Sequence, residues 1–106
     1  MEYMQTIIEK LTENAQLIYR QAIDADAIIS TLQSTGQGKF QAIFPAESGF
    51  RSSGRYFKPY VEELGQDIAH LAKLSTEQQK QALGPIVKKI ELLHTTLAQF
   101  QHSIQD

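Results

Sequence analysis

Residues 2–34, EYMQTIIEKLTENAQLIYRQAIDADAIISTLQS, decide the fold. Their apolar residues recur at alternating steps of four and three, which keeps them on one face of a helix. These residues are Met4, Ile8, Leu11, Ala15, Ile18, Ala22, Ala25, Ile29 and Leu32. No glycine or proline interrupts the pattern, so we predict one helix roughly 50 Å long. A helix of that length forms either the backbone of a small bundle or the seam of an oligomer.

Two more apolar stripes predict helices in the second half of the chain. One covers residues 59–74, with Pro59 at the first helical position, where the missing N–H of proline is not needed. The other covers residues 85–104, and its apolar residues again step by four and three. We therefore expect an all-α bundle in which helices 2–34 and 85–104 pack antiparallel, with helix 59–74 as the third member. Residues 1–106 are expected to form one domain.

Between the two C-terminal stripes the sequence predicts a short helix followed by a break. Ser75 with Gln78, or Thr76 with Gln79, matches the capping box that opens a helix. Pro85, preceded by glycine, has no N–H and crowds the previous turn, so we expect the helix to end or kink there. No run of alternating β-branched residues occurs, and we expect no strand.

The composition is typical of a globular domain and excludes several function classes. Hydrophobic residues make up 42% of the chain and charged residues 21%. The net charge of −2 argues against general nucleic-acid affinity, because counterion release needs several basic side chains acting together. Without cysteine there is no disulfide, thiol nucleophile or Cys-ligated zinc. No signal-peptide pattern and no membrane-spanning apolar run is visible, so we expect a cytoplasmic protein.

The connecting segment, residues 39–60 (KFQAIFPAESGFRSSGRYFKPY), differs in composition from the rest of the chain. It holds six of the nine aromatic residues, and four basic residues against one acidic residue. Interleaved rings and cations can stack on bases, or can fill pockets and bind carboxylates of a peptide. Four of the rings continue the flanking helical stripes and are expected to be core: Phe40, Phe44, Phe57 and Tyr60.

Within loop 45–58 of this segment we predict a binding site for a protein partner. Phe50, Arg51, Arg55 and Tyr56 fit no helical stripe. Together with Lys58, they are the predicted binding residues. The sequence thus favours a non-catalytic helical interaction module, with a homodimer through the long N-terminal helix as an alternative structural role.

No constellation in the sequence predicts catalysis, a metal or a cofactor. The three imidazoles, His70, His94 and His102, lack the four-residue spacing of a helical zinc pair. The phosphate-binding patterns G-x-x-x-x-G-K-[ST] and G-x-G-x-x-G are both missing. The remaining charges are expected to lie on solvated helix faces. They include the pair Glu63 and Asp67, one turn apart, and the pair Lys88 and Lys89.

From Lys39 onward the chain resembles the amino-terminal part of the primosomal replication protein PriC family. The resemblance rests on the F-x-x-x-F turn of Phe40 and Phe44, on the helix YVEELGQDIAHLAKL and on the helix LGPIVKKIELLHTTLAQF. It implies a helical domain that takes part in replication restart, together with single-stranded-DNA-binding protein and helicase loading. Because this chain lacks the family's long basic carboxy-terminal region, the implied role is protein–protein contact.

The chain also resembles short proteobacterial proteins, some of which carry a prephenate dehydrogenase label. A helical chain of 106 residues without a glycine fingerprint cannot supply the dinucleotide fold of such an enzyme. The string IDADAIISTL, residues 23–32, is similar to the first helix of chorismate mutase, a small helical enzyme. That resemblance implies a pocket in which Lys10, Arg20 and basic residues of other helices converge on a dicarboxylate.

Overall fold

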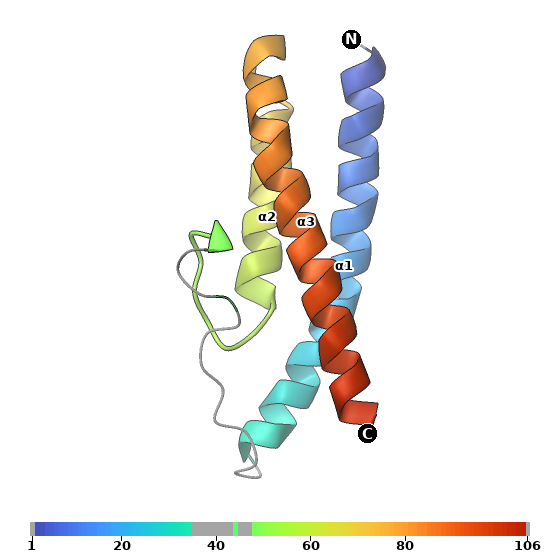
Figure 1. Ribbon diagram of the computed structural model, residues 1–106, viewed down its shortest axis with the longest axis vertical. Coiled ribbons are helices and arrows are strands. Elements are labelled where there is room, and N and C mark those ends of the chain that lie inside the picture. The colour runs from blue at the N-terminus through green and yellow to red at the C-terminus, as the bar shows by residue number, and fades with distance from the viewer. Residues whose placement is uncertain (1, 35–43, 45–47, 106) are drawn as a thin grey trace.

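The computed structural model describes residues 2–34, 44 and 48–105, and Figure 1 shows these as a bundle of three helices. Helix α1 covers Glu2–Ser34, α2 covers Lys58–Leu71 and α3 covers Thr76–Gln105. The described residues contain no strand, so the all-α prediction is confirmed. The longest dimension of the molecule is 50 Å, the length predicted for the first helix. None of the described helices is long and apolar enough to cross a membrane.

The three helices alternate in direction along the bundle. In Figure 1, α1 descends from the N-terminus, α2 returns beside it, and α3 descends again to the C-terminus. The two long helices α1 and α3 therefore run parallel, and the predicted antiparallel packing of these two helices is wrong. The reason is connectivity: α2 and α3 are joined by a tight turn, closed by the N–H groups of Lys73 and Leu74. That turn forces α3 to reverse the direction of α2, which itself runs opposite to α1.

Helix α3 continues through Pro85, so of the two expected outcomes, an end or a kink of the helix, the end is wrong. Proline removes one helical hydrogen bond, the one its N–H would have donated to the carbonyl of Gln81. Gln81 is exposed, and water can hydrate the freed carbonyl. The capping box is confirmed with Ser75 as its first residue, since its hydroxyl and the Gln78 side chain each accept the other's N–H at 3.3 Å.

The core lies along the axis where the three helices meet, and each pair of helices is in contact. Five residues of the predicted α1 stripe are buried: Leu11, Ile18, Ala22, Ala25 and Ile29. The predicted core rings Phe44, Phe57 and Tyr60 are buried as well, whereas Phe40 lies outside the described residues. Each fully buried large apolar side chain contributes about 1.5–3 kcal/mol, so these stripes hold the bundle together.

We expect Gly84→Ala to raise the free energy of unfolding by about 0.5–1 kcal/mol, measured by urea unfolding. Gly84 lies inside the continuous α3, and a Cβ there would meet no atom within 4 Å, so alanine supplies helix propensity without a clash. Gly49→Ala is the matched control and should destabilise, because φ at Gly49 is 102°, a conformation that alanine rarely adopts. Destabilisation by Gly84→Ala would contradict a continuous α3.

Candidate functional site

A carboxylate of α1 holds the beginning of α2. Asp26 Oδ1 accepts the N–H of Phe57 at 2.6 Å, and Oδ2 accepts the N–H of Lys58 at 3.0 Å. The first N–H groups of a helix have no partner within the helix, and they attract negative charge. Phe57, the N-cap residue, has no polar side chain, so Asp26 supplies the cap from a neighbouring helix.

The connecting segment is fastened to α2 by two side chains one turn apart. Glu63 accepts the N–H of Arg51 at 2.9 Å and the N–H of Ser52 at 2.6 Å. The hydroxyl of Tyr60 accepts the N–H of Gly54 at 3.1 Å and donates to the carbonyl of the same residue at 3.3 Å. These bonds satisfy backbone groups that have no ladder or helix to pair with.

A buried ion cluster links this segment to α3. Lys89 Nζ lies 2.8 Å from Glu63 Oε2 and also donates to Asp67, whose other oxygen is 2.9 Å from Arg51 Nη2. Glu63 is 3% exposed and Lys89 is 6% exposed. The predicted solvated faces are therefore wrong for these two residues, because each charge is paired inside the protein, while Lys88 is exposed as expected.

The cluster shifts the pKa values of two of its members. Burial by itself raises the pKa of the Glu63 carboxyl, but the hydrogen bonds from Lys89, Arg51 and Ser52 outweigh burial and lower it to about 2. The hydrogen bond to Asp67, together with the charges of Asp67 and Glu63, raises the pKa of Arg51. At neutral pH Glu63 is thus ionised, although it is buried.

Three rings pack against one another, and one of them lies beside the ion cluster. Phe44 and Phe50 are stacked with centroids 4.9 Å apart, and Tyr60 meets both edge-on at 5.0 and 5.1 Å. The ammonium of Lys89 lies 5.6 Å from the centroid of Phe50, within the range of a cation–π interaction. The aromatic composition of the connecting segment therefore serves to a large extent to pack the segment onto α2 and α3.

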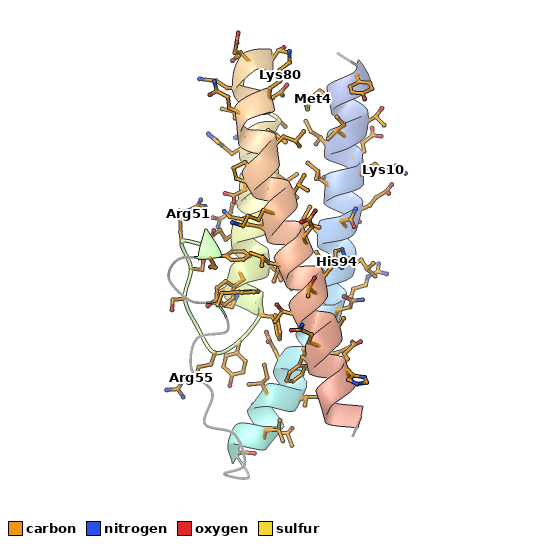
Figure 2. All side chains as sticks on the ribbon, in the orientation of Figure 1. Met4, Lys10, Arg51, Arg55, Lys80 and His94 are labelled. Atoms are coloured by element: carbon orange, nitrogen blue, oxygen red, sulfur yellow. The ribbon has the colours of Figure 1, made fainter. Side chains whose placement is uncertain are left out.

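The five predicted binding residues do not form one exposed surface. Phe50 is 7% exposed, and its ring faces the core because it stacks on Phe44. Arg51 pairs with Asp67, and Tyr56 is half-buried against the core. Arg55 projects away from the helices in Figure 2, and Lys58 is exposed. A binding role for Arg51, Arg55, Tyr56 and Lys58 stays a prediction, without the ring of Phe50 as a contact.

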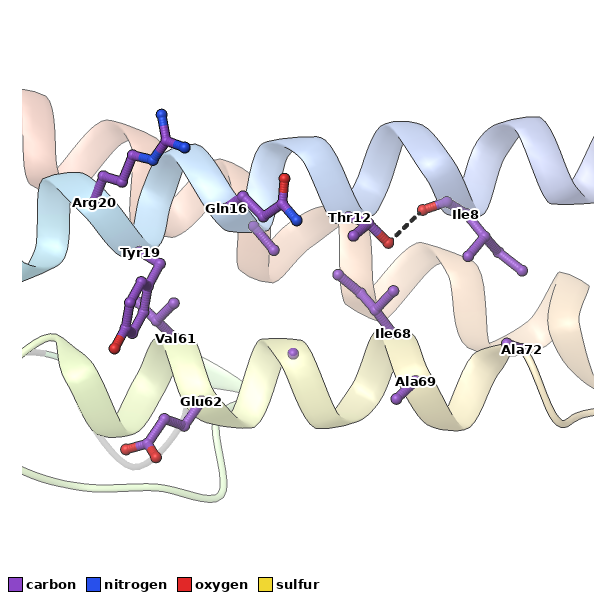
Figure 3. A pocket seen from close by; sticks show the side chains of 12 residues that line it. Ile8, Thr12, Gln16, Tyr19, Arg20, Val61, Glu62, Ile68, Ala69 and Ala72 are labelled. Atoms are coloured by element: carbon purple, nitrogen blue, oxygen red, sulfur yellow. Dashed lines mark hydrogen bonds between the residues drawn. The ribbon is translucent and has the colours of Figure 1, made fainter.

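The described residues form an open, mostly apolar groove of about 670 Å³ between α1 and α2, drawn in Figure 3. Its α1 side presents a row of larger side chains, and its α2 side presents mostly small ones. The lining residues are Ile8, Thr12, Ala15, Gln16, Tyr19, Arg20, Val61, Glu62, Gly65, Ile68, Ala69 and Ala72. We call this feature the α1–α2 groove.

The groove is open because α2 lacks bulk on the side that faces it. A Cβ added at Gly65 would meet no atom within 4 Å, and Ala69 and Ala72 are exposed. On α1, Tyr19 is 40% exposed although its ring descends toward α2 in Figure 3. Ile23, one turn further along α1, is 48% exposed. An apolar surface therefore continues along this side of α1 without a covering element among the described residues.

Among the described residues, no three metal-ligating side chains gather closely enough to hold a metal ion. His94 Nε2 lies 3.2 Å from Asn14 Oδ1 and joins α3 to α1. Of the two α1 cations expected in a chorismate-mutase pocket, Arg20 lines the α1–α2 groove, whereas Lys10 pairs with Glu13 at 3.8 Å on the surface.

Comparisons of the chain with protein-family models, with curated proteins and with solved structures gave no significant match. They therefore assign no family, and they do not test the resemblance to the PriC family. The ion cluster and the α1–α2 groove are the two features of the described residues that bear most on function.

We expect Lys89→Met to lower the free energy of unfolding by about 3 kcal/mol or more, measured by urea unfolding at neutral pH. The substitution leaves Glu63 buried and ionised without its cation, which is the costly case for a buried pair. Lys88→Met, the same change at the exposed neighbour, should alter the value by about 0.5 kcal/mol at most. Equal effects of the two variants would show that the buried pair does not carry stability.

The stability of the protein should depend on Glu63 below about pH 4.5. The folded-state pKa of Glu63 lies near 2, below its ordinary value of 4.5. The carboxylate therefore stabilises the fold fully above pH 4.5, and this contribution is lost as the pH falls toward 2. Unfolding measured across this range should give a flatter pH profile for Glu63→Gln than for the unsubstituted protein.

The control for this measurement is Glu62→Gln, because Glu62 is the exposed neighbour of Glu63. Its pH profile should run parallel to that of the unsubstituted protein. A Glu63→Gln profile that is also parallel would contradict the lowered pKa.

Proposed function

We propose that the protein is a non-catalytic interaction module that binds an α-helical segment of a protein partner in the α1–α2 groove. The observation that carries this proposal is the groove itself, an open apolar trough between two helices with a floor of small residues on α2. Amphipathic helices recognise grooves of this kind through apolar side chains that recur every three or four residues.

The dimensions of the groove suit a helix better than a compact ligand. From Val61 to Ala72 the α2 side extends for about 17 Å, at 1.5 Å per residue, which is about three helical turns. Gly65 and Ala69 allow the backbone of a docked helix to approach closely. A bundle of three helices with one open groove gains a fourth member in this way, and the apolar residues of the groove become core.

An enzyme of the chorismate-mutase type gains no support from the groove. Such an enzyme needs several cations that converge on a dicarboxylate. Among the residues that line the groove, Arg20 is the only cation and Glu62 the only anion, and both side chains point away from it in Figure 3. No other cationic side chain of the described residues lies on the groove wall.

The resemblance to the PriC family supplies one identity for the partner. Under that prediction the module would contact proteins of replication restart rather than DNA, in keeping with its net charge of −2. A cytoplasmic location and a homodimer through the long N-terminal helix are further predictions. Contact through Arg55 and Lys58, which lie at or just before the beginning of α2, is compatible with a partner seated in the groove.

Site-specific photo-crosslinking in the native cells tests the proposed function. With a photoreactive residue in place of Ala69, in the groove, we expect discrete crosslinked protein products. The control is Ala98, an exposed alanine on α3 outside the groove, where no such product should form. Equal products at both positions, or none at Ala69, would contradict a binding groove.

A further inference from the structure

We infer that the occupant of the α1–α2 groove is a second copy of this chain, with α1 of each copy packed against α2 of the other. The inference rests on the proposed function to the extent that it takes the groove as an interface. Three features of the groove favour a second copy as the partner: the charges at the two ends of the groove, the directions of α1 and α2, and the sizes of the residues that line the groove.

The charges at the edges of the groove repeat at the same interval on both helices. On α1, Glu9 and Arg20 are eleven residues apart, and Glu62 of α2 is eleven residues from Lys73, which lies in the turn after α2. Eleven residues are about three helical turns, so Glu9 and Arg20 lie on one face of α1. All four residues are exposed, and none makes an ion pair with another described residue.

Because α1 and α2 run in opposite directions, the later charge of α1, Arg20, lies level along the groove with the earlier charge of α2, Glu62. At one end of the groove, Arg20 and Glu62 project to opposite sides in Figure 3. Ile8 and Ala72 lie at the other end, and the next residues along the chain are Glu9 and Lys73. The end at Arg20 and Glu62 therefore has one basic and one acidic edge. From the chain positions of Glu9 and Lys73 we infer the reverse order of the two edges at the other end.

A two-fold axis parallel to the helices, running along the open groove, brings opposite charges together. This rotation keeps every residue at its level and places α1 opposite α2 of the partner. Arg20 then meets Glu62 of the partner subunit at one end, and Glu9 meets Lys73 of the partner subunit at the other. Symmetry repeats both pairs, which gives four ion pairs around a four-helix interface in which neighbouring helices are antiparallel.

The sizes of the facing residues favour this axis over a two-fold axis that lies perpendicular to the helices. With the axis parallel to the helices, Gln16 and Thr12 of α1 face the small α2 residues Gly65 and Ala69 of the other copy, and Tyr19, the bulkiest α1 residue of the groove, faces Val61. With the perpendicular axis, α1 would face α1 and α2 would face α2, so large residues would meet large ones. Interfaces pack well where large side chains face small ones.

The size of the surface predicts a weak, concentration-dependent dimer. Two helices about 20 Å wide and about 20 Å long present roughly 400 Å² per copy, below the roughly 800 Å² of a standard interface. The exposed Ile23 extends the apolar surface of α1 by one turn. We therefore expect monomers at low micromolar concentration and dimers at high concentration.

Sedimentation velocity from about 1 μM to about 1 mM tests the inference, a range that covers weak association. The mass should rise from 12.0 kDa toward twice that value. Arg20→Glu should raise the dissociation constant about tenfold, because it places like charges together twice. Arg20→Glu combined with Glu62→Arg should restore association. Circular dichroism checks that these surface variants remain folded.

The matched control is Lys10→Glu, the same charge reversal on α1 at an exposed residue outside the groove, which should leave association unchanged. A monomer at every concentration overturns the inference. An equal loss of association in Lys10→Glu also overturns it. The same holds if Glu9→Arg, and not Glu62→Arg, restores the association of Arg20→Glu, because a perpendicular axis would pair Arg20 with Glu9 of the partner subunit.

The same samples separate this inference from the proposed function. A crosslink from Ala69 to a different protein, with the purified chain monomeric throughout, would support the groove as a binding site and overturn self-association. A crosslinked product of twice the chain's mass, lost in Arg20→Glu and recovered in the double variant, supports both.

Discussion

The buried carboxylate of Glu63 is the interaction on which the rest of the structure depends. It belongs to α2, it accepts two backbone N–H groups of the connecting segment, and it pairs with Lys89 of α3. Three parts of the chain therefore meet at one side chain. A buried charge of this kind is tolerated only when all its partners are present, which makes the arrangement specific. Asp26 adds the connection to α1, because it caps the helix on which Glu63 lies.

The attachment of the connecting segment to α2 and α3 determines which side of the bundle remains open. Phe50 packs beside Lys89 and Tyr60, and Ser48 and Gly49 line a small cavity with Pro85 of α3. The segment therefore covers the side where α2 meets α3. No described part of the segment lines the groove between α1 and α2, where the surface is apolar. Phe50 and Arg51, two of the predicted binding residues, thus contribute to stability. The open surface lies between two helices that looked like ordinary bundle members.

Several properties could be predicted because they depend on local periodicity. Helix α1, the capping box at Ser75 and the core rings Phe57 and Tyr60 follow from spacing alone. The expectation that a helix ends at Pro85 was wrong, because packing along the whole of α3 outweighs the loss of one hydrogen bond at an exposed turn. The pairing of Glu63 with Lys89 joins residues far apart in the chain, and a helix-face pattern carries no information about such a partner.

By itself, then, the sequence determined that the protein is helical, where α1 lies and which face of it packs in the core, since these follow from the 3.6-residue repeat. Only the tertiary structure decided that α1 and α3 run parallel, that Phe50 is core and that Glu63 and Lys89 are buried. It also decided that small residues of α2 face a row of larger residues on α1 across an open groove. The physical reason is that direction, pairing and exposure depend on which helices become neighbours, and no local pattern specifies a neighbour.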